Sequence, residues 1–133
     1  MKRRCRIDPD SAFLRRSVAA LTRLRNGWRP NKSMLADARY AEHWLVIRRD
    51  DTTGYQFIGF PPRSPERSSM FIATVLAIDP AAGWALLAGG EWIRTGDALP
   101  MQSPFDAADV AKCAESWLAG QTQCDDRTFR YPR

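Results

Sequence analysis

The stretch from Met70 to Thr95 constrains the fold more than any other part of the chain. It contains three short runs rich in β-branched, aromatic and other apolar residues, separated by the turn sequences Pro80-Ala81-Ala82-Gly83 and Gly89-Gly90. Proline fixes φ at about −65° and glycine accepts a positive φ. The first sequence is therefore typical of a type I turn closed by a left-handed residue, and the second of a two-residue hairpin. Together they predict a three-stranded antiparallel meander.

The two turns also predict which residues pair across the strands. The expected pairs are Ile78 with Ala85, Leu76 with Leu87, Leu87 with Trp92, and Leu86 with Ile93. In this register neither face of the sheet alternates to polar residues, so we expect helices, a second sheet or a partner to cover both faces. The side chains that we expect to be buried are Trp84, Leu86, Ile93, Val75, Leu21 and Trp117.

Helix signals flank the predicted sheet. Asp8-Pro9-Asp10 is typical of a helix start and Gly27 of a helix stop, which predicts a first helix that ends at about Asn26. Its apolar side would carry Phe13, Leu14, Val18, Leu21, Leu24 and Trp28. Ser103-Pro104-Phe105-Asp106 predicts the start of a last helix that runs to Leu118 or Ala119 and stops at Gly120.

One short helix and two strands are predicted between the first helix and the meander. Asn31 or Ser33 would cap the helix, from about Met34 to Tyr40, and the strands would be His43–Arg48 and Tyr55–Phe60. The sequence therefore predicts a single α+β domain over residues 1–120. Its antiparallel sheet of about five strands is packed by an N-terminal and a C-terminal helix. We expect residues 121–133 to form a polar, flexible tail.

Composition is that of a globular protein. The chain has 133 residues, of which 44% are hydrophobic and 26% charged. No apolar run reaches the roughly 18–20 residues that a membrane span needs, and no hydrophobic signal segment follows the basic N-terminus. The three cysteines and His43, the single histidine, match no metal motif. We expect a cytoplasmic protein without metal, cofactor or membrane partner.

Positive charge is concentrated at the amino end. Residues 1–32 carry ten basic and two acidic side chains, a net charge of +8, whereas residues 33–133 carry ten basic and thirteen acidic ones, a net charge of −3. The basic side of the first helix is either an ordinary solvated face or a surface for phosphates or an acidic protein. The proline-rich loop 61–69 is either a connector or a binding loop. The candidate contact residues are Arg15, Arg16, Arg23, Arg25, Arg63 and Arg67.

One pattern spans residues 54–96. It consists of a glycine after an aromatic strand (54–60), a Thr-x-Leu strand, an Asp-x-x-x-Gly-Trp-Ala turn (79–85) and the later segment Trp-Ile-Arg-Thr-Gly (92–96). In this it resembles a small, uncharacterised family of bacterial proteins, mostly alphaproteobacterial, although Leu86 and Leu87 replace the polar residues expected there. The resemblance implies a shared fold and a bacterial or mobile-element origin, and it implies no activity.

Catalysis is disfavoured by the absence of motifs. The sequence contains no hydrolase nucleophile elbow, no phosphate-binding glycine loop and no paired metal-ligand motif. His43 would form a thiol–imidazole dyad with Cys5 or Cys113 only if the fold joined them. A small hydrolase-type enzyme is the second alternative.

We expect a small non-catalytic binding protein that docks on another protein, such as an inhibitor of a nucleoprotein complex, or that forms a homodimer through a sheet face. Five tryptophans and two apolar sheet faces favour this function, since such residues are enriched at interface anchors. The first alternative is direct binding of nucleic acid through the basic N-terminal helix. A helix-turn-helix is disfavoured because the second helix is short and Asp37 would repel DNA.

Overall fold

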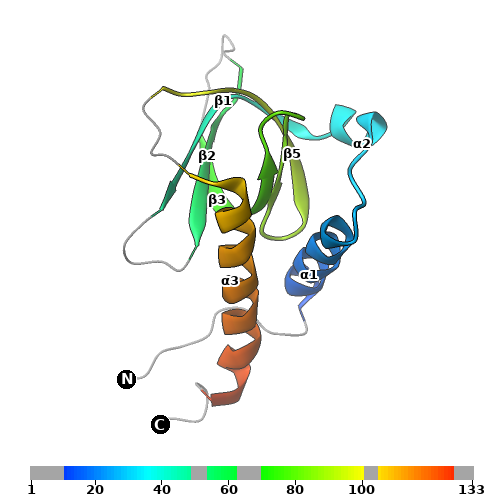
Figure 1. The fold of residues 1–133 in the computed structure, drawn as a ribbon, viewed down its shortest axis with the longest axis vertical. Coiled ribbons are helices and arrows are strands. Elements are labelled where there is room, and N and C mark those ends of the chain that lie inside the picture. The colour runs from blue at the N-terminus through cyan, green and yellow to red at the C-terminus, as the bar shows by residue number, and fades with distance from the viewer. Residues whose placement is uncertain (1–10, 49–53, 63–69, 101–104, 128–133) are drawn as a thin grey trace.

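The fold is a small closed β-barrel with helices on its outside. The computed structural model describes residues 11–48, 54–62, 70–100 and 105–127. The strands are β1 (Arg39–Arg48), β2 (Tyr55–Phe60), β3 (Phe71–Asp79), β4 (Trp84–Leu87) and β5 (Glu91–Ala98). The helices are α1 (Ala12–Arg25), α2 (Lys32–Ala36) and α3 (Ala107–Arg127) (Figure 1). The predicted α+β class, with a five-stranded meander between N-terminal and C-terminal helices, is confirmed.

Closure of the barrel follows from the meander. Strands that are consecutive in the chain pair antiparallel, so the direction alternates and the fifth strand points the same way as the first. β5 therefore returns beside β1 as its parallel neighbour. Closure leaves no free sheet edge and encloses one face of the sheet, which covers that face without a second sheet.

The β3–β4 turn has the predicted chemistry, whereas the pairing beyond it slips. Gly83 has φ of +82°, and Ile78 lies opposite Ala85 as predicted. A register shift between Val75 and Ala77 then places Val75, and not Leu76, opposite Leu87. The predicted pair of Leu76 with Leu87 is therefore wrong, because a β-bulge inserts an extra residue into β3.

The β4–β5 turn is one residue longer than predicted. Leu87 lies opposite Glu91 and Leu86 opposite Trp92, so the predicted pairs of Leu87 with Trp92 and Leu86 with Ile93 are wrong. Ala88 belongs to the turn together with the two glycines, whose φ angles are +98° and +83°. A slip of one residue turns every side chain of a strand to its opposite face. Ile93 therefore points into the barrel, and Trp92 points out of it.

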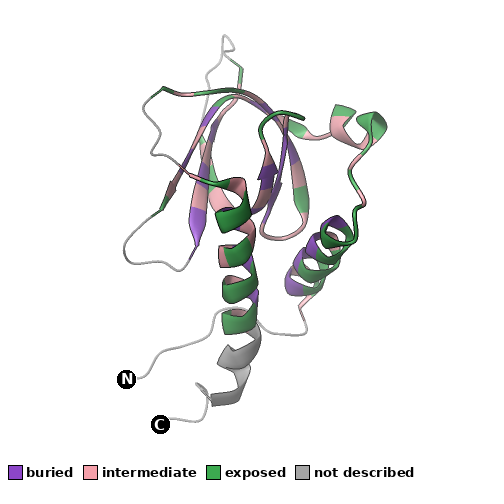
Figure 2. Cartoon of the chain, in the orientation of Figure 1, coloured by how far each residue is buried: buried purple, intermediate pink, exposed green. Residues whose placement is uncertain are grey.

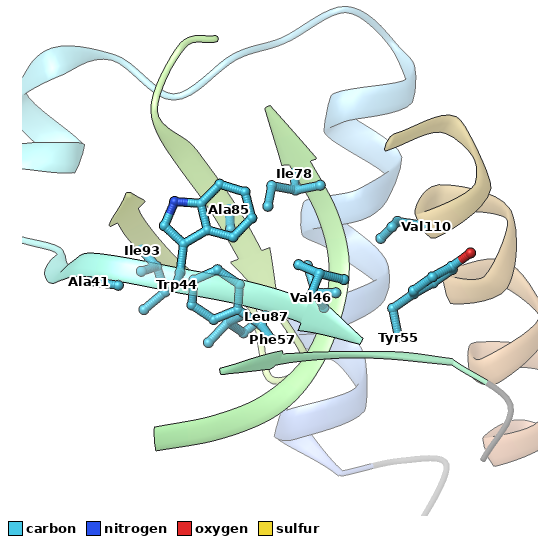
Figure 3. Packing of buried hydrophobic residues seen from close by; sticks show 11 residues of the cluster. Ala41, Trp44, Val46, Tyr55, Phe57, Ile78, Ala85, Leu87, Ile93 and Val110 are labelled. Carbon is cyan, nitrogen blue, oxygen red and sulfur yellow. The ribbon is translucent and has the colours of Figure 1, made fainter. Parts of the chain in front are cut away.

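Two apolar clusters form the core. The first fills the barrel and contains Trp44, Phe57, Leu87 and Ile93 (Figure 3), with the Trp44 and Phe57 rings stacked at 5.9 Å between centroids. The second lies outside β3, β4 and β5, beneath the helices, and contains Leu14, Leu21, Leu24, Leu76, Trp84, Leu86, Ala114 and Leu118. Of the side chains predicted to be buried, Trp84, Leu86, Ile93, Val75 and Leu21 are confirmed, and Trp117 is only partly buried.

Helix α1 ends as predicted but has a different cap. The predicted start, Asp8-Pro9-Asp10, lies outside the described residues, and the cap is Ser11, whose side chain accepts a hydrogen bond from the Leu14 amide at 3.2 Å. Val18 was expected on the apolar side but is 40% exposed, whereas Ser17 is fully buried. The buried side of α1 is thus rotated slightly from the apolar stripe.

Helix α2 is shorter than predicted and begins earlier. Asn31 caps it, accepting a hydrogen bond from the Met34 amide at 2.8 Å. The helix ends at Ala36, and Tyr40 belongs to β1, which begins at Arg39 and not at His43. Pairing of this early part of β1 with β5 overrides the weak local helix signal.

Helix α3 does not stop at Gly120. Ser103, the predicted cap, lies outside the described residues, and the Asp106 carboxylate accepts from the Ala108 amide at 3.0 Å. The helix continues to Arg127, six residues past the predicted start of the tail at 121. A glycine inside a helix costs only about 1 kcal/mol, so it ends a helix reliably only where the flanking sequence also does.

Candidate protein-docking surface

The outward face of β1, β2 and β3 carries a continuous apolar surface. The registers align Leu45, Ile58 and Ile72 in one row across the three strands, and Ile47, Gln56 and Thr74 in the next. His43 and Phe60 form a third row. Because successive side chains of a strand alternate between faces, these residues point away from Trp44, Val46 and Phe57, which fill the barrel.

None of the helices covers this surface among the described residues. Leu45, Ile47, Ile58 and Phe60 are partly exposed and belong to neither core cluster. Ile72 is 51% exposed and Met70, at the start of β3, is 54% exposed. Helix α3 runs along β3 and α1 lies on the β5 side, so the β1 and β2 side is left open (Figures 1 and 2). We call Leu45, Ile47, Ile58, Phe60, Met70 and Ile72 the β1–β3 face.

The residues that define the β1–β3 face include no acid, lysine or arginine. The polar side chains in its rows are His43, Gln56 and Thr74, and Gln56 donates a hydrogen bond of 3.3 Å from Nε2 to Thr74 Oγ1. An uncharged apolar patch of this kind loses little on desolvation and gains the hydrophobic effect when another apolar surface covers it. The geometry therefore favours contact with protein.

The basic residues of α1 do not form one free surface. Arg16 donates from Nε to the Gly89 carbonyl at 2.8 Å and so fixes α1 to the β4–β5 turn. Arg25 pairs with Glu115 of α3 at 3.1 Å. Arg23 lies over the Trp28 ring, 5.2 Å from its centroid, and Arg15 is exposed. Arg63 and Arg67 lie outside the described residues. Two of the four described candidates thus serve the fold itself.

Sequence reasoning missed the β1–β3 face as a site. Residues 44 to 47 are all apolar, so their alternation between inside and outside leaves no polar–apolar pattern to detect. It also missed Arg39, which forms a bidentate pair with Glu91 at 3.0 Å and lies 3.8 Å above the Phe71 ring. The available signal was the run of four apolar residues at 44–47 followed by the mostly apolar strand at 55–60.

The groups considered for catalysis lie in different environments. His43 is exposed on β1, with Nε2 at 3.9 Å from the Glu42 carboxylate. Cys113 packs against the cluster inside the barrel, and Cys5 lies outside the described residues. Within the described ranges, no three His, Cys, Asp or Glu side chains are grouped so that they could hold a metal ion. Over the same part of the chain, no helix has the length and apolar character needed to cross a membrane.

Comparison with known proteins does not assign the chain to a family. No protein-family model, no curated protein and no solved structure matches the chain.

Proposed function

We propose that the chain is a small non-catalytic binding protein that docks onto another protein through the β1–β3 face. The observation that carries this proposal is the open, uncharged apolar row of Leu45, Ile58 and Ile72 on a closed barrel. Among the described residues, folding leaves Ile72 exposed and Leu45 and Ile58 partly exposed, although the same chain buries two other apolar clusters. Contiguous exposed apolar surface on a soluble domain is typical of an interaction site.

The net positive charge of the chain favours a different protein over a second copy as the occupant. Strands about 4.8 Å apart and side-chain rows about 7 Å apart give the face an area of roughly 200–300 Å². A stable specific interface buries about 800 Å² on each partner. The face is therefore the centre of a larger interface. Arg48 is exposed beside Ile47, and the chain has a net charge of +5, so a partner with acidic residues around an apolar centre complements it.

Direct binding of nucleic acid through α1 receives less support. Arg16 and Arg25 already bond to Gly89 and Glu115, and each would have to leave a partner in order to reach a phosphate. A small enzyme is also less supported, since His43 is exposed on β1, whereas Cys113 lies on α3 and packs against the barrel cluster.

The test compares two single substitutions that add the same charge to exposed apolar positions. Ile72→Glu places a carboxylate in the β1–β3 face, and Val18→Glu places one on the exposed side of α1. The tagged chain is used to recover a protein from an extract of its native host, and the interaction is then reconstituted with both proteins purified. We expect Ile72→Glu to weaken the reconstituted complex at least about tenfold, because it buries an unpaired charge.

Val18→Glu should leave the affinity unchanged, and near-ultraviolet circular dichroism should show that both variants are folded. Two results would contradict the proposal: equal affinity for the wild type and Ile72→Glu, or a tight homodimer that Ile72→Glu dissociates without any other partner. The second result would show that the face is occupied by a copy of the chain.

A further inference from the structure

A second site lies on the other side of the molecule, where α2 and the β3–β4 turn meet β5. It is a pocket of about 480 Å³, within the range of small-molecule sites. Its walls include the apolar side chains of Leu35 and Ala82, and its polar members are Lys32, Tyr40, Arg94 and Thr95. Among the described residues, no acidic side chain lines it. It shares no residue with the β1–β3 face.

One polar atom at this pocket lacks a hydrogen-bond partner. Arg94 Nε is buried and unpaired within the described part of the chain. Thr95 Oγ1 is also buried and unpaired, but Thr95 follows Arg94 in β5, so its side chain points to the other face, into the barrel with Ile93. A buried donor without an acceptor lowers stability, and folded proteins rarely leave one unless a ligand or a bound water completes it. The guanidinium of Arg94 therefore points to a missing acceptor at the pocket.

The arginine is held in a fixed orientation. Its guanidinium carbon lies 4.7 Å from the centroid of the Tyr40 ring, which stacks against it from β1. It forms no ion pair with a carboxylate of the described residues, unlike Arg25 and Arg39. A planar guanidinium that is pre-oriented and unpaired matches the geometry of a phosphate, to which it donates two parallel hydrogen bonds. Lys32 supplies a second positive charge at the same pocket.

Aromatic and basic residues continue from the pocket towards α1. Trp92 is two residues before Arg94 and points out of the same strand face. Trp28 packs on Trp92 with 5.6 Å between ring centroids, and Arg23 lies over Trp28. Such an alternation of rings and positive charges is typical of surfaces that bind phosphorylated, base-bearing ligands.

We propose that this pocket binds a phosphorylated ligand of nucleotide size. Arg94 and Lys32 hold the phosphate, and the flat remainder of the ligand rests on the apolar wall formed with Leu35. The phosphate comes either from a free nucleotide or from a single-stranded nucleic acid. The proposal does not rest on the docking function, since the two sites have no residue in common.

The probes for the test are the four ribonucleoside monophosphates, a ten-residue oligothymidylate and inorganic phosphate. Binding to the full chain is followed by tryptophan fluorescence and calorimetry at 50 and 200 mM salt. We expect Arg94→Gln to weaken binding by about tenfold or more, since it removes a charge-assisted pair of hydrogen bonds. Lys32→Gln should weaken it by a smaller factor, and this exposed position tolerates the change if Arg94→Gln fails to fold.

Two matched controls accompany these variants. Arg25→Gln removes an equal charge at an arginine outside the pocket, and Ile72→Glu alters the docking face; both should bind as the wild type does. If a nucleotide is the ligand, the monophosphates bind as tightly as the oligothymidylate. If a strand is the ligand, the oligothymidylate binds more tightly, with an affinity that falls steeply with salt. The proposal is overturned if no probe binds at millimolar concentration, or if Arg25→Gln weakens binding as much as Arg94→Gln does.

Discussion

Ser17 connects α1 to the barrel, although helical periodicity gives that role to Val18. Its hydroxyl accepts a hydrogen bond from the Gly89 amide at 2.7 Å and donates one to the Phe13 carbonyl at 3.0 Å. The neighbouring Arg16 bonds to the Gly89 carbonyl, so both backbone groups of one turn glycine are satisfied by α1. From the sequence alone, Ser17 looks like a polar interruption of the apolar stripe. Its structural role cannot be predicted, because its hydrogen-bond partner is 72 residues away in the chain.

Substitution of Ser17 tests this connection. Ser17→Ala should lower the free energy of unfolding by about 1–3 kcal/mol, because it leaves the partly buried Gly89 amide without an acceptor. Val18→Ala, one residue along, should change it by less than about 0.5 kcal/mol, because Val18 is exposed. Urea denaturation of the two variants measures both values. A smaller loss for Ser17→Ala than for Val18→Ala would mean that the turn does not depend on this bond.

At the scale of the elements, strands were predicted better than their pairing. The bounds of β2 were predicted without error, and the meander strands at 71–79, 84–87 and 91–98 follow the predicted runs. The register was wrong wherever it depended on one residue, at the bulge after Val75 and at the turn that includes Ala88. Local turn chemistry does not distinguish two-residue from three-residue turns at Ala-Gly-Gly, and packing of Ile93 inside the barrel decides the outcome.

Two glycines should respond to alanine in opposite directions. At Gly96 of β5 a Cβ atom would lie 2.4 Å from the Glu42 carbonyl oxygen of β1, which belongs to rigid backbone. At Gly120 of α3 no atom lies within 4 Å of it. Gly96→Ala should therefore destabilise the protein by about 1–3 kcal/mol or more, and Gly120→Ala should stabilise it by about 0.5–1 kcal/mol.

Thermal unfolding followed by far-ultraviolet circular dichroism measures both shifts. The Gly120→Ala result also tests the course of α3, because a helix that ended at Gly120 would favour glycine there. If Gly120→Ala destabilised the protein, the result would indicate that α3 ends at Gly120, as predicted from the sequence.

At the scale of the whole molecule, the two helices and the barrel leave one side open. Helix α3 spans both clusters, since Val110 packs into the barrel cluster and Leu118 into the outer one. Helices α1 and α3 also meet through Phe13 and Trp117, whose ring centroids are 6.2 Å apart. The sequence predicted that two apolar sheet faces need cover. It did not predict barrel closure, which covers one face from within and, among the described residues, leaves the outer side of β1, β2 and the first part of β3 without a helix.

The candidate sites were predictable only in part. Charge counting found the basic amino end, but it cannot show which arginines bond to their own fold, as Arg16 and Arg25 do. The arginine of the second pocket, Arg94, has no sequence signal that separates it from the other arginines of the chain. Both sites arise from residues that are brought together by strand pairing and by the return of β5 to β1.

Position-resolved photocrosslinking tests the docking claim most directly. A photoreactive phenylalanine analogue replaces Ile72 in one variant and Val18 in another, two exposed apolar positions on different sides of the molecule. After illumination in cells of the native host, the Ile72 variant should crosslink one protein in high yield, and the Val18 variant should not. Crosslinking of the same protein from Val18 alone, or of no protein from Ile72, would contradict docking through the β1–β3 face.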